Sequence, residues 1–117
     1  MVELLQRGDK LEQNVIYQVD LVIDNEIFTE YYQWLLGHVK IMLSFPGFLR
    51  VEIYEPMHQA KEQQTELRLC YSLASKEALE AYLQNHAAQM REEGIKKFGK
   101  KFSAARSDYL KLGEFNK

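Results

Sequence analysis

Five ionisable side chains are predicted on or next to the face of a β-sheet that mixes polar with apolar residues, and they are the groups best suited to hold a charged ligand. They are Asp20, Arg50, Glu52, Arg68 and Arg106. Buried charges in proteins are normally paired, so a network of the Asp20–Arg68 or Glu52–Arg50 type is the simpler interpretation. The alternative is that an arginine binds a carboxylate or phosphate of a ligand through its bidentate fork.

Trp34 and His38 are four residues apart in a segment with helical periodicity, and His38 is the first candidate for proton transfer. The competing interpretation is a histidine favourably placed near a helix C-terminus. We favour that interpretation because no nucleophile or metal ligand stands at a matching spacing. His86 lies on an apolar stripe, typical of a core or interface residue, and His58 lies in a polar, solvated loop.

No HxH, HExxH or clustered Cys/His motif is present, so we expect no metal site and no cofactor. Cys70 is a nucleophile only if a base lies beside it, and a lone strand cysteine is more often a small buried hydrophobe. Asp20 and His38 are therefore weak catalytic candidates. The full candidate ligand-binding set is Gln18, Asp20, Trp34, His38, Arg50, Tyr54, Arg68 and Arg106.

The charge is uneven along the chain. Residues 1–90 hold 7 basic and 13 acidic side chains, whereas residues 91–117 hold 8 basic and 4 acidic ones. The basic excess includes a cluster that can contact phosphates, namely Lys96, Lys97, Lys100 and Lys101. We favour a solvated helix face, because the net charge is −2 and gives no overall attraction to nucleic acid.

Length and composition indicate one globular domain. The chain has 117 residues, 46% of them hydrophobic and 27% charged, which is enough to bury a core without disulfides or metals. A single cysteine, no secretory signal pattern and no apolar run of membrane-spanning length favour a cytoplasmic location. We expect an N-terminal arm over residues 1–14, a domain over 15–112 and a tail over 113–117.

Residues 15–24 give the clearest strand signal. Their odd positions are all apolar, whereas the even positions alternate Ile16, Gln18, Asp20, Val22 and Asp24. Further strands are predicted over 48–55, 65–73 and 104–112. In the second strand the pattern places Leu49, Val51 and Ile53 on one face and Phe48, Arg50, Glu52 and Tyr54 on the other.

Two helical regions separate these strands. The first is predicted from Asp24 or Asn25 to about residue 43, with Gly37 allowing a close neighbour. The second begins after the N-cap Ser75 and is interrupted at Gly94. A short continuation with Ile95, Phe98 and Phe102 on its apolar stripe is broken by Gly99.

The order strand, helix, strand, strand, helix, strand predicts a ferredoxin-like α+β fold, with two helices on one face of a four-stranded antiparallel sheet. The sheet face away from the helices combines charged residues with large apolar ones, including Ile16, Val22, Phe48 and Tyr54. That face is too apolar for water alone and too polar for a dry core. A homodimer packed through this sheet face would cover it and enclose a partly polar pocket.

The sequence resembles the dimeric α/β-barrel superfamily, which includes antibiotic-biosynthesis monooxygenases, and more closely a small bacterial family of domains of unknown function. The matching stretches are IYQVDLVID, WLLGHVKIMLSFPGF from Trp34 to Phe48, YLQNHAAQMREEGIKKFGKKF, and Ala105-Arg106. The resemblance implies the fold and the dimer over residues 15–112. Some superfamily members degrade haem with asparagine, tryptophan and histidine, but the first strand here lacks an asparagine.

These observations predict a small homodimeric domain with a small-molecule pocket between the sheets and a binding or accessory role. The first alternative is a cofactor-independent monooxygenase acting on a small organic compound, with Trp34 and His38 lining its site together with sheet-face residues. A weaker alternative is nucleic-acid binding through the basic C-terminal region. An RNA-recognition surface is disfavoured because Tyr71, the aromatic residue of the third strand, shares the helix-facing register of Leu67 and Leu69.

Overall fold

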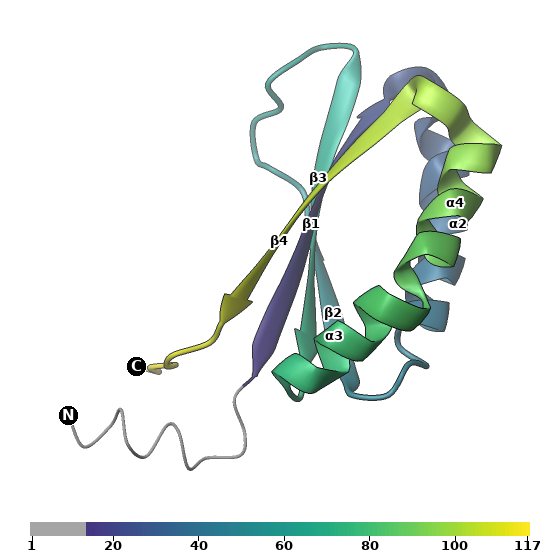
Figure 1. The fold of residues 1–117 in the computed structure, drawn as a ribbon. Helices are drawn as coiled ribbons and strands as arrows, with labels where there is room; N and C mark the ends of the chain where they lie inside the picture. Colours follow the sequence, from purple (N-terminus) through teal and green to yellow (C-terminus); the bar gives the residue numbers. More distant parts are fainter. Residues whose placement is uncertain (1–13) are drawn as a thin grey trace, which may run out of the picture.

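The computed structural model describes residues 14–117, in the predicted order of strands and helices (Figure 1). The strands are β1 (Val15–Asp24), β2 (Phe48–Tyr54), β3 (Gln64–Leu73) and β4 (Phe102–Leu110). The helices are α2 (Phe28–Met42), α3 (Lys76–Asn85) and α4 (Ala87–Phe98), with 3₁₀ turns η1 (Asn25–Ile27) and η2 (Gly99–Lys101). The predicted arm lies outside the described residues except for Asn14.

The sheet has the order β2-β3-β1-β4, and all neighbouring strands are antiparallel. All three α-helices cover one face and leave the other face, here called the open face, without helices (Figure 1). This is the ferredoxin-like α+β fold that the element order predicts. The bounds of β1 are the predicted ones, and its residues alternate strictly between buried and half-buried.

One strand face was predicted wrongly. The ladder between β2 and β3 shifts register between Phe48 and Arg50, where Leu49 is the extra residue. Phe48 therefore pairs with Leu73 and is buried against the helices, whereas Leu49 is 53% exposed. Simple alternation cannot reveal a bulge, so the pattern placed Phe48 on the open face.

The helices depart from the predicted breaks. The helical region is interrupted at His86, between α3 and α4. Gly94 lies buried inside α4 and does not interrupt it. Gly37 is exposed, and a side-chain carbon added there would have no atom within 4 Å, so the predicted close neighbour is absent. Ser75 caps α3 as predicted, accepting a hydrogen bond from the Ala78 amide.

Gly99 ends α4 with a positive φ of 60°, which glycine adopts without steric cost. The chain then turns directly into β4, so Phe102 begins a strand and does not continue a helix stripe as predicted. Strand β4 starts and ends two residues earlier than expected. Within the part of the chain that is described, no helix is long and apolar enough to cross a bilayer.

The core contains two aromatic groups beneath the helices. Tyr17, Phe48, Tyr71 and Tyr82 pack at one end, with ring centroids 5.3 to 6.1 Å apart for the contacting pairs. Tyr31, Trp34, Phe98 and Phe102 pack at the other end, with Tyr31 4.9 Å from Phe98 and 5.0 Å from Phe102. Rings of this size hold α2 and α4 away from the sheet.

Candidate functional site

The predicted ligand-binding residues fall on two opposite faces of the sheet. Gln18, Asp20, Arg50, Tyr54 and Arg68 belong to the open face, because β1, β2 and β3 pair them in one register. Trp34, His38 and Arg106 line a cavity on the helix side. The structure therefore does not bring the predicted set together as one site.

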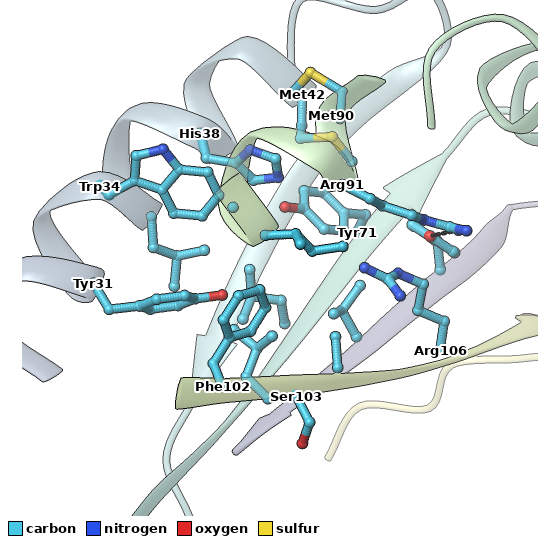
Figure 2. A pocket seen from close by; sticks show the side chains of 18 of the residues that line it. Tyr31, Trp34, His38, Met42, Tyr71, Met90, Arg91, Phe102, Ser103 and Arg106 are labelled. Atoms are coloured by element: carbon cyan, nitrogen blue, oxygen red, sulfur yellow. Dashed lines mark hydrogen bonds between the residues drawn. The ribbon is translucent and has the colours of Figure 1, made fainter. Parts of the chain in front are cut away.

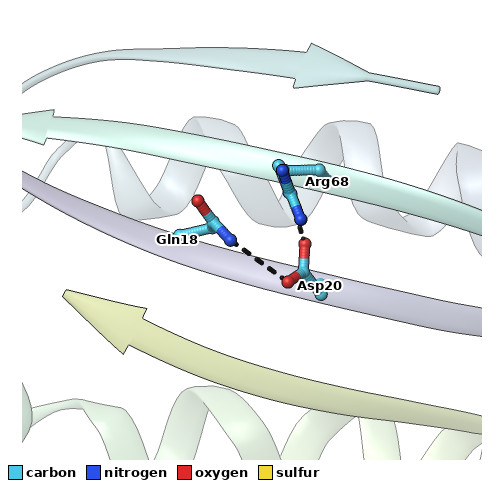
Figure 3. Close-up of polar contacts among 3 residues, drawn as sticks. All are labelled: Gln18, Asp20 and Arg68. Atoms are coloured by element: carbon cyan, nitrogen blue, oxygen red, sulfur yellow. Dashed lines mark hydrogen bonds and ion pairs between the residues drawn. The ribbon is translucent and has the colours of Figure 1, made fainter. Parts of the chain in front are cut away.

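On the open face, Asp20 joins β1 to β3 (Figure 3). Its carboxylate accepts a 2.8 Å hydrogen bond from Arg68 Nε and a 3.1 Å bond from Gln18 Nε2. The hydrogen bond from Arg68 lowers the pKa of the Asp20 carboxyl, more than burial raises it. This confirms the predicted Asp20–Arg68 pair, although its side chains are 39% and 54% exposed in the single chain.

The remaining open-face groups show little sign of catalytic activation. Among the described residues, the predicted Glu52–Arg50 ion pair is absent; instead the Glu52 carboxylate raises the pKa of Tyr54. Burial raises the pKa of Cys70, so its thiol stays protonated near neutral pH and is a poor nucleophile.

A cavity of about 260 Å³ lies between the sheet and helices α2 and α4 (Figure 2). Its walls are mainly aromatic and aliphatic side chains from β1, β3, α2 and α4, and β4 closes one side. Pockets for small ligands are typically apolar with a few convergent polar groups. The polar groups here are His38, Arg91, Arg106 and the tyrosine hydroxyls, whereas the hydroxyl of Ser103 points away from the cavity (Figure 2).

His38 points into this cavity from α2, beside Trp34 (Figure 2). The two rings stack with centroids 4.7 Å apart. Burial, assisted by the positive charge of Arg106, lowers the pKa of His38 to about 4. The imidazole is therefore neutral at pH 7, which contradicts both a near-neutral pKa and a protonated histidine at the helix C-terminus.

The buried Nδ1 atom of His38 has no hydrogen-bond partner among the described residues. A buried polar atom without a partner is destabilising and is uncommon in native proteins. A ligand in the cavity can supply the missing bond. His38 is suited to orient a ligand, and its low pKa makes it a weak base.

Arg106 was predicted on or beside the open face, and this was wrong. Strand β4 pairs with β1 so that Arg106 lies opposite Val19, a buried residue of the helix-facing side. The sequence around Arg106 reads AARSD, which has no clear alternation of apolar and polar residues, so the pattern does not indicate which face of the sheet Arg106 occupies.

Arg91 is a cavity residue that sequence reasoning missed. Its Nη2 donates a 2.9 Å hydrogen bond to the Tyr17 hydroxyl, and its buried Nε has no acceptor in the described part of the chain. The available signal was its position next to Met90, at the border of the apolar stripe of α4. An arginine there can extend its aliphatic stem over the core and bring its charged end to the cavity.

Three tyrosines of the cavity, Tyr31, Tyr71 and Tyr82, remain neutral phenols. Burial raises the pKa of Tyr31 and Tyr71 above the ordinary value and raises that of Tyr82 to about 12. The positive charge of Arg106 opposes the increase at all three, so its guanidinium is within electrostatic range of each ring. Their hydroxyls can donate hydrogen bonds to a ligand without releasing a proton at pH 7.

The remaining histidines and the lysine cluster are accounted for by packing, solvent exposure or ion pairs. His86 stacks on Phe45 at 4.2 Å, as expected for a packed histidine, and His58 is exposed. Lys96, Lys97 and Lys101 form ion pairs with Glu92, Glu30 and Glu26, respectively. Across residues 14–117, no three acidic, histidine or cysteine side chains are grouped so as to hold a metal ion.

Comparisons with known proteins agree with the fold. A family model described as "Domain of unknown function (DUF4286)" matches residues 14–111. A search of curated proteins gave no significant match. Solved structures are similar at low identity, which supports the fold alone.

Three of these structures cover nearly the whole chain. A proposed antibiotic biosynthesis monooxygenase from Deinococcus radiodurans has a TM-score of 0.68 at 14% identity, over 87% of this chain and 96% of its own. A dimeric ferredoxin-like protein from an uncultured marine organism has a TM-score of 0.66 at 14% identity, over 89% and 100%. A proposed antibiotic biosynthesis monooxygenase from Bacillus cereus has a TM-score of 0.64 at 11% identity, over 90% and 99%.

Proposed function

The chain belongs to the DUF4286 family of domains of unknown function, and we propose that it is a homodimeric protein that binds a small organic molecule in the cavity beneath α2 and α4. The observation that carries this proposal is the cavity of about 260 Å³, with aromatic walls and two buried polar atoms, His38 Nδ1 and Arg91 Nε, that have no hydrogen-bond partner among residues 14–117. These features fit a ligand site better than a defect of packing, because native cores rarely leave both volume and hydrogen bonds unused.

Trp34 makes this proposal straightforward to test, because it is the only tryptophan of the chain and it lines the cavity. Its fluorescence can be titrated with a panel of neutral and charged one-ring and two-ring aromatic compounds. A bound compound should change the emission in a saturable way and raise the melting temperature.

A cavity-filling variant provides the control. Ala104 lines the cavity, so Ala104→Leu should abolish saturable binding, whereas Ala88→Leu on the exposed side of α4 should leave it intact. Circular dichroism of both variants separates a filled cavity from an unfolded protein. Equal binding by wild type and a folded Ala104→Leu variant would exclude the cavity as the site.

The proposed dimer forms through the open face. This face carries the half-buried Ile16 and Val22 between polar residues, and Tyr54 and Tyr109 are about half exposed at its edges. Similar folds include proteins described as dimeric. Light scattering that gives the mass of one chain at micromolar concentration would refute this part.

Cytoplasmic location is proposed from the free thiol of Cys70, which suits a reducing compartment.

An enzyme that oxidises a small organic compound without a cofactor is the second candidate. It is favoured by the similarity to proposed monooxygenases and by the place of Trp34 and His38 in the cavity wall. The low pKa of His38 makes it a weak base, so we rank binding first. Oxygen uptake measured with an electrode, in the presence of a compound that binds, would decide for the enzyme.

A further inference from the structure

Two arginines from different elements meet at one end of the cavity. Arg91 comes from α4 and Arg106 from β4, and both side chains extend into the same region (Figure 2). The positive charges of both arginines oppose the increase that burial causes in the pKa of Tyr82. Arg91 is also held over β1 by Tyr17, and Arg106 is the diagonal neighbour of Tyr17 across the sheet.

Neither arginine has a carboxylate partner among residues 14–117. The ion pairs of this region use lysines, and the hydrogen bond of Arg91 goes to the Tyr17 hydroxyl. Asp108 is the nearest acid along β4, since it lies directly opposite Tyr17, but it is exposed and forms no ion pair with either arginine. Two guanidinium groups that converge without a counter-ion repel each other and attract an anion.

The other cavity groups cannot supply that negative charge. His38 is neutral, and the buried tyrosines keep their protons because burial raises the pKa of each. The cavity thus has a cationic end at Arg91 and Arg106 and an aromatic end at Tyr31 and Trp34. This polarity matches a ligand with an acidic group at one end and a flat apolar body.

We propose that the cavity binds an aromatic carboxylate whose acid group lies between Arg91 and Arg106 and whose ring packs toward Trp34 and Tyr31. The proposal rests on the proposed binding function and names its ligand class. A planar carboxylate suits the free Nε–H of Arg91 and the unpaired fork of Arg106, because guanidinium and carboxylate form parallel hydrogen bonds. A phosphate offers similar oxygens, so the experiment includes both acids.

Three matched compounds test this, namely 4-nitrobenzoate, 4-nitrobenzamide and 4-nitrophenyl phosphate. Each carries a nitro group that quenches Trp34 fluorescence on contact. The compounds differ only in the group opposite the nitro group, which is a carboxylate, a neutral amide or a phosphate. We expect the carboxylate to bind at least about tenfold more tightly than the amide, because the gain from a hydrogen bond to a charged group corresponds to at least this change in affinity. We expect Arg106→Gln to remove this preference, because it should weaken carboxylate binding much more than amide binding.

The control Lys40→Gln makes the same change of charge on the exposed side of α2, and it should keep the preference. Asp108→Asn should leave carboxylate affinity equal or increase it; a decrease would overturn the assignment of Arg106 as the anion-binding group. Tighter binding of the phosphate than of the carboxylate would overturn the carboxylate class.

Equal binding of amide and carboxylate would refute the anion site and leave the proposed binding function standing. Absence of saturable quenching by all three compounds would refute the aromatic-carboxylate class, while saturable binding of another compound of the wider panel would keep the proposed binding function. Arg91→Lys provides a second folded variant in case Arg106→Gln lowers stability. It keeps the charge but removes the fork, and we expect it to weaken carboxylate binding several-fold.

Discussion

Gly94 of helix α4 lines the cavity beside Trp34, and replacing it by alanine gives a quantitative test of the site geometry. A side-chain carbon at this position would lie 3.1 Å from Cη2 of Trp34 and 3.4 Å from Cζ of Phe102. Both distances are at or below the closest comfortable contact between carbon atoms, so the indole ring must move. Overpacking of this kind costs about 1–3 kcal/mol.

Gly37 is the matched control, because it is also inside a helix but has no atom within 4 Å of the added carbon. Replacing glycine by alanine in an exposed helix interior stabilises a protein by about 1 kcal/mol. Gly37→Ala should show this gain in full. In Gly94→Ala the cost of crowding Trp34 is subtracted from the same gain. The free energy of unfolding of this variant should therefore be unchanged or lower by up to about 2 kcal/mol.

Chemical denaturation followed by Trp34 fluorescence measures both effects in one experiment. The two variants should differ by about 1–3 kcal/mol in free energy of unfolding, which is roughly 4 °C in melting temperature per kcal/mol for a chain of this size. The native emission of Gly94→Ala should shift, whereas that of Gly37→Ala should not. Equal stabilisation of both variants, with unchanged emission, would show that Gly94 does not adjoin Trp34 and would remove this wall of the cavity.

Three further outcomes follow from the same geometry. The pKa of His38 is lowered to about 4 in the folded chain, so between pH 4 and 6.5 the unfolded chain binds one more proton than the folded chain. The free energy of unfolding should therefore fall as the pH falls through that window. Denaturation curves should show a smaller fall for His38→Asn and an unchanged fall for His58→Gln. Asp20→Asn should lower the free energy of unfolding by less than about 1 kcal/mol if the open face is solvated, but by roughly 3–5 kcal/mol per broken pair if a dimer buries Arg68. Melting temperatures of wild type and variant, measured over a dilution series, distinguish these cases. A small, concentration-independent loss would contradict the dimer. Ser75→Ala should destabilise by about 1 kcal/mol, and hydrogen exchange should report the loss in the first turn of α3.

The sequence predicted the topology well because the strand alternation and the Ser75 cap are local signals. It also predicted the Asp20–Arg68 pair, since both residues lie in strands whose register follows from the apolar face. Phe48 was placed on the wrong face because a bulge in β2 alters the register without a local signature. Arg106 was placed on the wrong face because the sequence around it lacks a clear apolar alternation.

The cavity was missed for a different reason. Its residues come from four or more elements, and in the sequence each looks like ordinary core: Tyr17, Tyr31 and Tyr71 have the spacing of packed aromatics. Only the polar groups distinguish the site, and His38 and Arg91 become notable because their buried Nδ1 and Nε atoms have no partner in the part of the chain that the structure describes. Hydrogen-bond satisfaction is a three-dimensional property that residue spacing does not encode.

The two faces of β1 therefore perform separate tasks, and adjacent residues serve different ones. Tyr17 holds Arg91 at the cavity, while Gln18, the next residue, supports Asp20 on the open face. A protein with this arrangement can cover one face with a second copy without closing the other, because the helix-side cavity does not use the open face. Dimer formation and ligand binding should then be separable: Asp20→Asn should leave the affinity for 4-nitrobenzoate unchanged, and Arg106→Gln should leave the oligomeric mass unchanged. If either substitution alters both properties, the two faces are coupled through the sheet, and the division of roles proposed for β1 is wrong.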